Sequence, residues 1–353
     1  MKVLVTGATG LIGAHTTMGL LDNGHDVRLL ARSPQRAKQY FNEHGYDIQD
    51  IVEGDMLDAE IVREALTGCN AVVHAAGLVC LDPKQADTVY HTNVNGMRNV
   101  LGIAHTMGID RMVYTSSISA LFDGDKEVDV WGPLNESTAP YARSKIACEA
   151  FARELQEQGV PLRISYPGMV LGPDDPGLTT SNKGLLQFIE LMVPITTSGV
   201  QIVDVRDVAE LHVRLLEAEH TLPATEYRYV VAGNFHDWRD VTSIMNRVLE
   251  KPILSPPCPG VVLRALGHVL DALRKVIPHQ IPLTVESANL VTLWKPIFSE
   301  RTTKILGKSL RPTEETIVDT LTWANRKGHI ACKMASTGGH NTIGQLAEIS
   351  DIK

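Results

Sequence analysis

The first 170 residues alternate short apolar runs with longer stretches of helical periodicity. Apolar runs of strand length stand at residues 2–6, 25–31, 50–53, 71–77, 111–117 and 161–165. Runs of this length are typical of strands that a parallel sheet buries on both faces. Helical spacing lies between them, for example over 90–107, where Val94, Met97, Leu101 and Ala104 share one face. This alternation predicts an α/β fold built on a Rossmann-type doubly wound parallel sheet.

The pattern changes after residue 170. Residues 171–199 are rich in Gly, Pro and Thr, 226–231 form a strand pattern, and 237–330 alternate helical stretches with Pro-rich breaks. We therefore predict a discontinuous organisation. A Rossmann domain covers 1–170, with 200–235 returning to it, and a smaller C-terminal substrate-binding annex covers 171–199 and 236–330. Residues 331–353 form a polar tail.

One stretch of the annex, from Val261 to Ile277, is amphipathic. Its polar face holds Arg264, His268, Asp271 and Lys275, and Leu263, Leu266, Leu270 and Leu273 lie near the other face. A helix that packs on the annex is the plain interpretation, and a helix that covers an apolar substrate or rests on a membrane surface is the alternative. Trp131 and the loop 121–140 precede the candidate catalytic tyrosine, so we expect them to border the substrate pocket.

Composition and charge narrow the class of partner. The net charge of −8 argues against a general nucleic-acid binder, which usually carries a basic excess. The five cysteines show no CxxC spacing, so we expect no disulfide framework and no metal site. The chain holds no run of about 18 apolar residues and no recognisable signal peptide, so no spanning membrane segment is expected. We expect a cytoplasmic protein with a small-molecule substrate and no nucleic-acid partner, and we leave a homodimer open.

A glycine-rich turn follows the first strand. Gly7-Ala-Thr-Gly-Leu-Ile-Gly13 stands between Lys2–Thr6 and a helical pattern that reaches Leu21. Strand, glycine turn and helix in this order are typical of a dinucleotide-binding site. The glycines allow the backbone to approach a pyrophosphate, and the helix N-terminus offers free N–H groups to it. The alternative is a glycine-rich turn that binds no ligand.

The end of the second strand predicts which dinucleotide binds. Arg32 stands there, Arg36 and Lys38 follow closely, and no acidic residue occurs before Glu43. An acidic residue at this point binds the ribose hydroxyls of NAD, whereas an arginine suits the 2′-phosphate of NADP. We therefore predict that NADP(H) is preferred, with NAD(H) as the alternative. The competing interpretation is that these cations are solvated loop charges.

Four polar residues are candidates for the chemistry. Tyr141 and Lys145 are one helical turn apart, and a positive charge near a phenol favours the phenolate, below the free pKa of about 10. This spacing alone also occurs on ordinary exposed helices. Ser117 ends the fifth strand, where its hydroxyl can donate to a carbonyl or an alkoxide or simply cap the strand. His74 ends the apolar fourth strand, and we interpret it as a packed structural residue rather than a base.

The assembled motifs carry a family resemblance. They are Thr6-Gly-Ala-Thr-Gly-Leu-Ile-Gly13, Gly54-Asp55, His74-Ala-Ala-Gly77, Asn93-Val-Asn-Gly96, Thr115-Ser-Ser117, Tyr141-x-x-x-Lys145, Tyr166-Pro-Gly-Met-Val-Leu-Gly-Pro173 and Val203-Asp-Val-Arg-Asp-Val-Ala209. Together they resemble the short-chain dehydrogenase/reductase superfamily in its extended, epimerase/dehydratase-like branch. Within this branch the chain is similar to the group of dihydroflavonol reductases, cinnamoyl-CoA reductases and 3β-hydroxysteroid dehydrogenases. The resemblance covers about residues 1–235 and is weak beyond them.

The resemblance implies roles for individual residues. Ser117 would orient the carbonyl, Tyr141 would be the acid and base, and Lys145 would bind the nicotinamide ribose and lower the pKa of the tyrosine. With the arginines added, the candidate cofactor contacts are Gly7, Thr9, Gly10, Leu11, Ile12, Arg32, Arg36, Asp55, Met56, Ala75, Ala76, Gly77, Asn93, Ser116, Tyr141, Lys145, Pro167 and Val170.

The implied function is hydride transfer between NADP(H) and a carbonyl or alcohol of a small, apolar or aromatic substrate. An NAD-dependent 3β-hydroxysteroid dehydrogenase and a sugar-nucleotide epimerase or dehydratase are the alternatives inside the fold. Sugar nucleotides need contacts to a diphosphate, and the annex shows no obvious basic cluster. A non-catalytic NADP-sensing regulator is the alternative outside catalysis, and the complete set of Ser117, Tyr141 and Lys145 counts against it.

Overall fold

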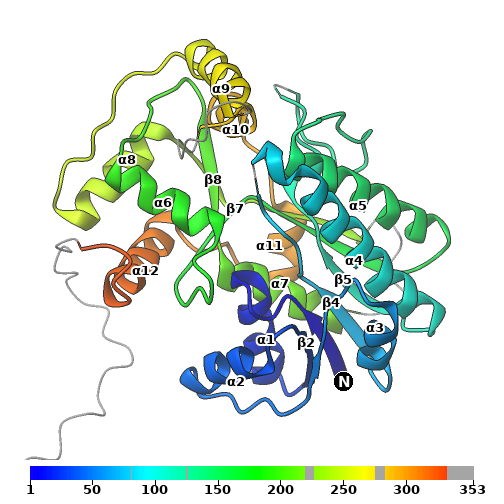
Figure 1. Cartoon of the computed structure of the whole chain (residues 1–353). Coiled ribbons are helices and arrows are strands. Elements are labelled where there is room, and N and C mark those ends of the chain that lie inside the picture. Colours follow the sequence, from blue (N-terminus) through cyan, green and yellow to red (C-terminus); the bar gives the residue numbers. More distant parts are fainter. Residues whose placement is uncertain (81, 125, 219–225, 275–282, 332–353) are drawn as a thin grey trace, which may run out of the picture.

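A parallel sheet of seven strands forms the centre of the computed structural model, which describes residues 1–80, 82–124, 126–218, 226–274 and 283–331 (Figure 1). The strand order is β3-β2-β1-β4-β5-β6-β9. The strands are β1 (Lys2–Thr6), β2 (Asp26–Ala31), β3 (Ile51–Glu53), β4 (Ala71–His74), β5 (Arg111–Thr115), β6 (Leu162–Pro167) and β9 (Arg228–Val231). Every pairing between them is parallel. The Rossmann-type prediction is confirmed.

Two layers of helices bury the sheet. One layer holds α1 (Leu11–Asp22), α2 (Pro34–Glu43), α7 (Val205–Glu217) and α11 (Glu300–Leu306), and the other holds α3 (Ala59–Leu66), α4 (Ala86–Thr106) and α5 (Pro140–Glu157). Alternate residues of each strand supply the two cores. In β1, for example, Val3 and Val5 pack in the first core and Leu4 in the second. The apolar runs of the sequence have this form because both faces of the sheet are covered.

A smaller unit lies beside the carboxyl ends of the core strands. Its three-stranded sheet has the order β10-β8-β7, in which β8 pairs parallel with β7 and antiparallel with β10. Its elements are β7 (Met169–Leu171), β8 (Gly199–Asp204), β10 (Asn234–Asp237), α6 (Thr180–Glu190), α8 (Trp238–Leu249), α9 (Gly260–Arg274), α10 (Val285–Leu293) and α12 (Thr313–Arg326). It has a core of its own, which includes Leu185, Trp238 and Leu321. We call this unit the annex.

Two short connections of the core form single 3₁₀ turns, at Pro83–Gln85 and Ile118–Ala120.

Ion pairs connect the core to the annex. Arg206, in the first turn of α7, forms ion pairs with Asp204 at 2.7 Å and with Asp319 of α12 at 2.7 Å. Helix α7 of the core layer is thereby joined to α12 of the annex, so the two units are linked through side chains as well as through the chain.

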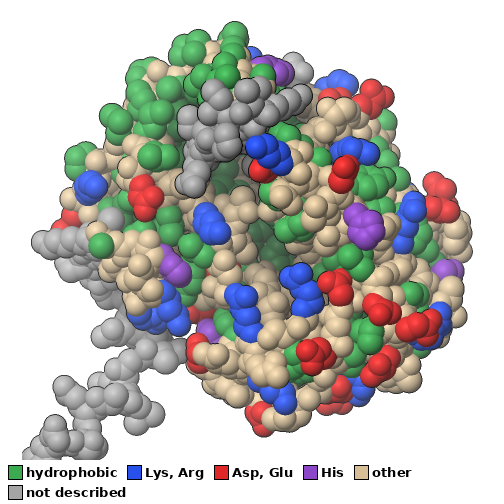
Figure 2. Space-filling model, viewed as in Figure 1, with side chains coloured by type: hydrophobic (Ala, Val, Ile, Leu, Met, Phe, Trp, Pro, Cys, Tyr) green, Lys and Arg blue, Asp and Glu red, His purple; other side chains and the backbone are tan. Residues whose placement is uncertain are grey.

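Helix α9 differs in part from its sequence expectation. Leu263 and Leu270 are buried, but Leu266 and Leu273 are exposed, as are Val261 (70%) and Val262 (60%). The reason is that α9 meets α10 along a narrow stripe at Gly267, where an added β-carbon would lie only 3.0 Å from the Thr284 carbonyl oxygen. In the space-filling view hydrophobic side chains gather over this part of the annex (Figure 2). Lys275–Ile277 and the tail 332–353 fall outside the described residues.

None of the helices in the described part of the chain is long and apolar enough to cross a membrane.

Candidate active site

The glycine turn is shaped by close backbone contacts. Gly7 has a φ of +77°, and a β-carbon added there would lie 2.6 Å from the Ala76 amide nitrogen. A β-carbon at Gly13 would lie 2.1 Å from the Gly7 carbonyl oxygen. Gly10 precedes α1 without a side-chain cap. The first N–H groups of α1 are therefore open to a ligand, and the turn fits a dinucleotide pyrophosphate.

A cavity of about 510 Å³ joins this turn to the annex. Its opening is the hollow visible in the space-filling view, with hydrophobic side chains in its depth (Figure 2). Of the residues that the sequence nominated, it is lined by Gly10, Leu11, Ile12, Ala75, Gly77, Ser116, Ser117, Tyr141, Lys145, Pro167 and Val170. The structure thus brings the glycine turn and the candidate catalytic residues to one cavity.

Tyr141 and Lys145 both lie on the first turns of α5. Pro140 is the first residue of this helix, and its fixed φ suits that position. The Lys145 side chain is buried, and its Nζ donates to the Thr115 carbonyl oxygen at 3.0 Å and to the Tyr114 hydroxyl at 3.4 Å. Burial lowers the pKa of Lys145 from its usual value. The helix therefore holds an amine and a phenol side by side against the end of β5.

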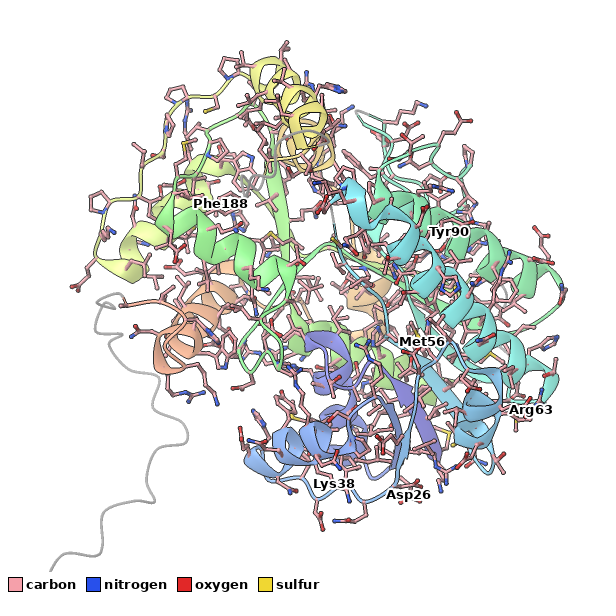
Figure 3. All side chains as sticks on the ribbon, in the orientation of Figure 1. Asp26, Lys38, Met56, Arg63, Tyr90 and Phe188 are labelled. Carbon is pink, nitrogen blue, oxygen red and sulfur yellow. The ribbon has the colours of Figure 1, made fainter. Side chains whose placement is uncertain are left out.

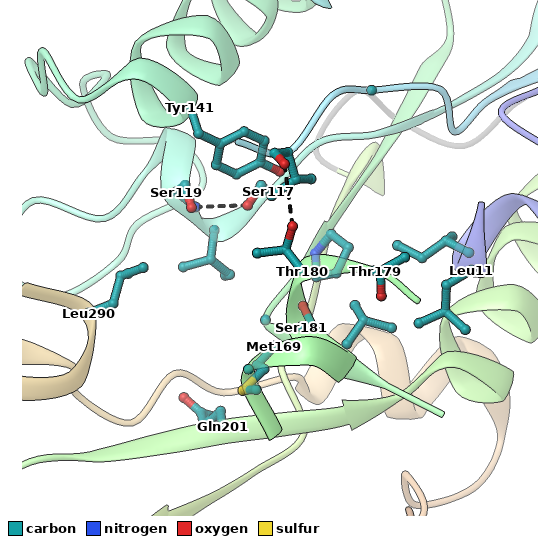
Figure 4. A pocket seen from close by; sticks show the side chains of 18 of the residues that line it. Leu11, Ser117, Ser119, Tyr141, Met169, Thr179, Thr180, Ser181, Gln201 and Leu290 are labelled. Carbon is teal, nitrogen blue, oxygen red and sulfur yellow. Dashed lines mark hydrogen bonds between the residues drawn. The ribbon is translucent and has the colours of Figure 1, made fainter. Parts of the chain in front are cut away.

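Ser117 completes the group at the end of β5. Its Oγ accepts a hydrogen bond from the Ser119 amide at 3.1 Å, which fixes the side chain at the start of the following turn (Figure 4). It also faces the Tyr141 hydroxyl, and its hydroxyl group acts to lower the pKa of the phenol. The strand-end cap and the contact with the tyrosine are thus both present.

The pKa of Tyr141 is raised in this structure, whereas the sequence predicted that Lys145 would lower it. Burial raises it to about 12, and the Ser117 hydroxyl only partly offsets this effect. Negative charge at Glu286 raises it further. Lys145 does not dominate because its ammonium group is directed to Thr115 and Tyr114 rather than to the phenol. Desolvation therefore outweighs the lysine in this structure.

Several other candidate cofactor contacts are engaged in local structure. The Asn93 side chain accepts from the Leu78 amide at 2.7 Å and donates to the Ser144 hydroxyl at 2.9 Å, so it fastens the loop after β4 to α5. The Ser116 hydroxyl donates to Glu149 at 3.2 Å. Asp55 accepts from the Leu57 amide at 3.0 Å.

The remaining candidates border the cavity or lie outside it. Met56 packs beneath α4, where a β-carbon at Gly96 would lie 2.6 Å from its sulfur (Figure 3). Arg36 donates to the Pro176 carbonyl oxygen at 3.1 Å, and Lys38 to Gln49 at 3.2 Å. Arg32 is exposed, and its side chain forms no hydrogen bond or ion pair with the described residues. Thr9, next to Gly10, is half-buried.

The comparison with known proteins identifies the family. Residues 3–232 match the NAD dependent epimerase/dehydratase family. The chain belongs to this family. It is an NAD(P)-dependent oxidoreductase of the short-chain dehydrogenase/reductase type.

Individual relatives agree with this assignment. A Synechocystis sp. protein named "Putative dihydroflavonol 4-reductase" is 32% identical over 232 residues, which are 64% of this chain and 66% of that protein. Cinnamoyl-CoA reductase 1 of Petunia hybrida is 28% identical over 350 residues, 93% of each chain. The yeast methylglyoxal/isovaleraldehyde reductase Gre2, solved with NADPH, has a TM-score of 0.67 at 22% identity, over 94% of this chain and 100% of that one. This last likeness concerns the fold.

In this family member His74 has a structural role, as the sequence suggested. Its Nδ1 lies 2.8 Å from the Thr6 hydroxyl, and its ring stacks on Tyr114 with 5.9 Å between centroids. Burial lowers the pKa of His74 to about 3, so the imidazole is neutral at ordinary pH. It packs strands β1, β4 and β5 together and does not line the cavity.

The expectation for Trp131 and its loop is wrong. No residue of 121–140 among those described lines the cavity. The centroid of the Trp131 ring instead lies 4.4 Å from the Arg228 guanidinium carbon and 5.7 Å from the Arg301 guanidinium carbon, away from the cavity. Because cation–π contacts hold the ring there, proximity in sequence to Tyr141 did not place it in the pocket.

The annex wall of the cavity was missed by sequence reasoning. It consists of Met169, Thr179, Thr180, Ser181, Gly184, Phe188, Val200, Gln201, Trp238, Ser287, Leu290, Val291 and Trp294. Figure 4 shows Tyr141 and Ser117 on one side of the cavity, with Thr180, Met169 and Leu290 around it. These residues come from β7, β8, α6, α8 and α10 or from the ends of these elements, and of them only Met169 lies within a motif that the sequence singled out. Helical spacing within α6 and α10 was the only other available signal.

Proposed function

We propose that this oxidoreductase transfers hydride between NADP(H) and a carbonyl or alcohol of a small, neutral, apolar or aromatic substrate, as a dihydroflavonol reductase does. The observation that carries the proposal is the composition of the cavity. Tyr141 and Ser117 line it together with large apolar side chains, among them Phe188, Leu290 and Trp294. Lys145 is the one charged side chain that lines it among the described residues. An apolar pocket with few polar groups suits a neutral substrate.

Each residue has a separate role in cofactor binding or in proton transfer. Gly10, Leu11 and Ile12 would hold the pyrophosphate, and Lys145 the nicotinamide ribose. The bound cofactor supplies the hydride. In the reducing direction Tyr141 donates its proton to the carbonyl oxygen, while Ser117 hydrogen-bonds that oxygen and orients it. In the oxidising direction the phenolate of Tyr141 takes the alcohol proton.

The alternatives differ in what the cavity must bind. A sugar nucleotide brings two phosphates, and these usually meet arginine or lysine; within the described lining only Lys145 is cationic, and it is already bonded to Thr115. This counts against an epimerase or dehydratase. A steroid is also apolar, so a 3β-hydroxysteroid dehydrogenase is the second candidate.

A substrate panel tests the proposal. Aromatic and aliphatic aldehydes and ketones, dihydroflavonols, steroids and sugar nucleotides are offered with NADPH or NADP, and the absorbance of reduced nicotinamide is followed. We expect turnover of neutral apolar carbonyls and none of sugar nucleotides. Tyr141→Phe should keep cofactor binding and lose about two to four powers of ten in kcat, the usual share of positioned acid catalysis. Near-normal turnover by Tyr141→Phe, or turnover of sugar nucleotides alone, contradicts the proposal.

A further inference from the structure

The helix that carries Tyr141 lacks a cap of its own. A side chain at the N-cap position normally accepts a hydrogen bond from the second or third N–H of the helix. In α5 this position is Ala139, which cannot do so. The N–H of the third helical residue, Ala142, donates instead to Glu286 Oε1 at 3.2 Å. The cap of the catalytic helix is therefore provided from the annex, by a residue 144 positions away.

Glu286 belongs to the helix that forms one wall of the substrate cavity. It is in the first turn of α10, and its neighbour Ser287 lines the cavity together with Leu290 and Val291. The other end of α10 is fastened separately, because the Ser198 hydroxyl donates to the Trp294 carbonyl oxygen at 2.6 Å. The bond from Ala142 to Glu286 thus joins the first turn of the substrate wall to the first turn of the catalytic helix.

A second carboxylate lies one helix further out. Asp271 of α9 accepts from the Val285 amide at 3.0 Å, so α9 holds the first residue of α10, whose N-cap is its own Thr284. Burial, together with the charge of Asp271, raises the pKa of Glu286 to about 7. Glu286 Oε2 is buried and has no hydrogen-bond partner within the described residues. The groups that face Glu286 are Tyr141 from α5 and Asp271 from α9.

We infer that Glu286 is a positioning residue for the reaction. By capping α5 it fixes the substrate wall relative to the Tyr141 hydroxyl, and by its charge it adjusts the acidity of that hydroxyl. The inference rests on the proposed function, in which Tyr141 is the acid. It adds a residue outside the family's motifs, from the part of the chain where the resemblance is weak. It also explains why a buried carboxyl is placed beside an acid catalyst.

Two substitutions separate the two effects. Glu286→Ala removes the cap and the charge, whereas Glu286→Gln keeps an oxygen that can accept from Ala142 and removes only the charge. Glu314→Ala is the matched control, because Glu314 lies in the first turn of another annex helix and is exposed, paired with Arg247 at 2.9 Å. Kinetics are measured with a substrate that the wild type turns over, across pH, for alcohol oxidation.

The expected results differ for each variant. Glu286→Ala should raise KM and lower kcat/KM by about tenfold, comparable to the loss of a helix cap. Glu286→Gln should restore KM to near the wild-type value. Because the glutamate charge raises the pKa of Tyr141, its removal should shift the rising limb of the oxidation profile to lower pH. Glu314→Ala should change neither quantity.

Hydrogen exchange makes the test independent of turnover. The amides of residues 141–146 should exchange faster in Glu286→Ala than in wild type, and at the wild-type rate in Glu286→Gln and Glu314→Ala. Unchanged exchange, or unchanged KM and pH profile in both Glu286 variants, overturns the inference. Full activity in Tyr141→Phe instead overturns the proposed function, and the exchange result still decides whether Glu286 anchors the helix.

Discussion

At the scale of single residues, burial decides the electrostatics of this site. Tyr141 and Lys145 are four positions apart on one helix, yet each is held by its own neighbours. The amine bonds to a backbone carbonyl, and the phenol faces the Ser117 hydroxyl. Removing water from both groups favours their neutral forms, which raises the pKa of Tyr141 and lowers that of Lys145. A phenol that stays protonated is suited to donate a proton to a carbonyl.

The pH dependence follows from this raised pKa. Alcohol oxidation needs the phenolate, whose fraction grows with pH up to a pKa of about 12. The oxidation rate at saturating substrates should therefore rise steadily between about pH 6 and 9, roughly in proportion to the phenolate. A pH–rate profile with chemistry rate-limiting measures this. A flat or falling profile would show that Tyr141 is not the base.

Arg32 offers a prediction about cofactor choice. It is exposed and makes no bond to the described residues, whereas Arg36 donates to Pro176. A free guanidinium at the end of β2 can form charge-assisted bonds with a 2′-phosphate, worth about 1.5–3 kcal/mol. We expect kcat/KM to favour NADPH over NADH by roughly one to two powers of ten. Arg32→Asp should remove this preference and leave the rate with NADH within a few-fold, and Lys38→Asp is the control. A wild-type preference for NADH would refute it.

At the scale of elements, close contacts between backbones set the positions of the helices. Helix α1 approaches β1 closely enough that Gly13 touches the Gly7 carbonyl, and α9 touches α10 at Gly267. Helix α5, which carries Tyr141 and Lys145, is placed by three elements. Its residue Ser144 receives a hydrogen bond from Asn93 of α4, its Lys145 bonds to the end of β5, and its first turn bonds to α10. The candidate active site is therefore formed where the first turns of α5 and α10 meet the carboxyl end of β5.

A substitution in α1 tests the close approach at the glycine turn. In Gly13→Ala the new β-carbon would lie 2.1 Å from the Gly7 carbonyl oxygen, so the turn must shift. We expect cofactor affinity to fall by at least about tenfold and stability to fall by about 1–3 kcal/mol. Gly19→Ala, in the same helix, meets only the Val213 side chain at 3.4 Å and is the control. Equal dissociation constants for the two variants, measured by fluorescence titration of NADPH, would contradict the assignment of the turn.

At the scale of the whole molecule, the substrate cavity lies where the core and the annex meet. One wall consists of strand ends and α5, and the other of α6, α8 and α10. The annex has its own core and is tied to the sheet layers by the ion pairs of Arg206. In the proposed function, the catalytic groups thus come from the core, and the residues that define substrate size come from the annex.

This arrangement predicts that substitutions of two large apolar residues have different effects on kcat/KM. Leu290 of α10 lines the cavity, whereas Trp131 lies outside it between two arginines. Leu290→Ala should change kcat/KM for a good substrate by about tenfold, the usual value for contacts of a few methylenes. Trp131→Ala should leave kcat/KM within twofold of wild type. Steady-state kinetics on one substrate measure both, and the reverse order of effects would place the pocket at the loop 121–140.

The local sequence determined much of this protein. The apolar runs predicted the strands of the large sheet that precede the annex, because burial on both faces demands such runs. The glycine turn was identified because close backbone approach is a local requirement, whereas Ser117, Tyr141 and Lys145 were assigned roles through the family resemblance that the ordered motifs carry. The cavity then brought these residues together.

Only the tertiary structure decided the rest. Three features join residues that are far apart in the chain. They are the annex wall, the contacts of Trp131 with Arg228 and Arg301, and the hydrogen bond from Ala142 to Glu286. The pKa of Tyr141 also belongs here, because burial depends on every element packed around the phenol. Such contacts depend on how the surfaces of two elements fit and on how much water their packing removes. The spacing of residues along the sequence predicts neither of these.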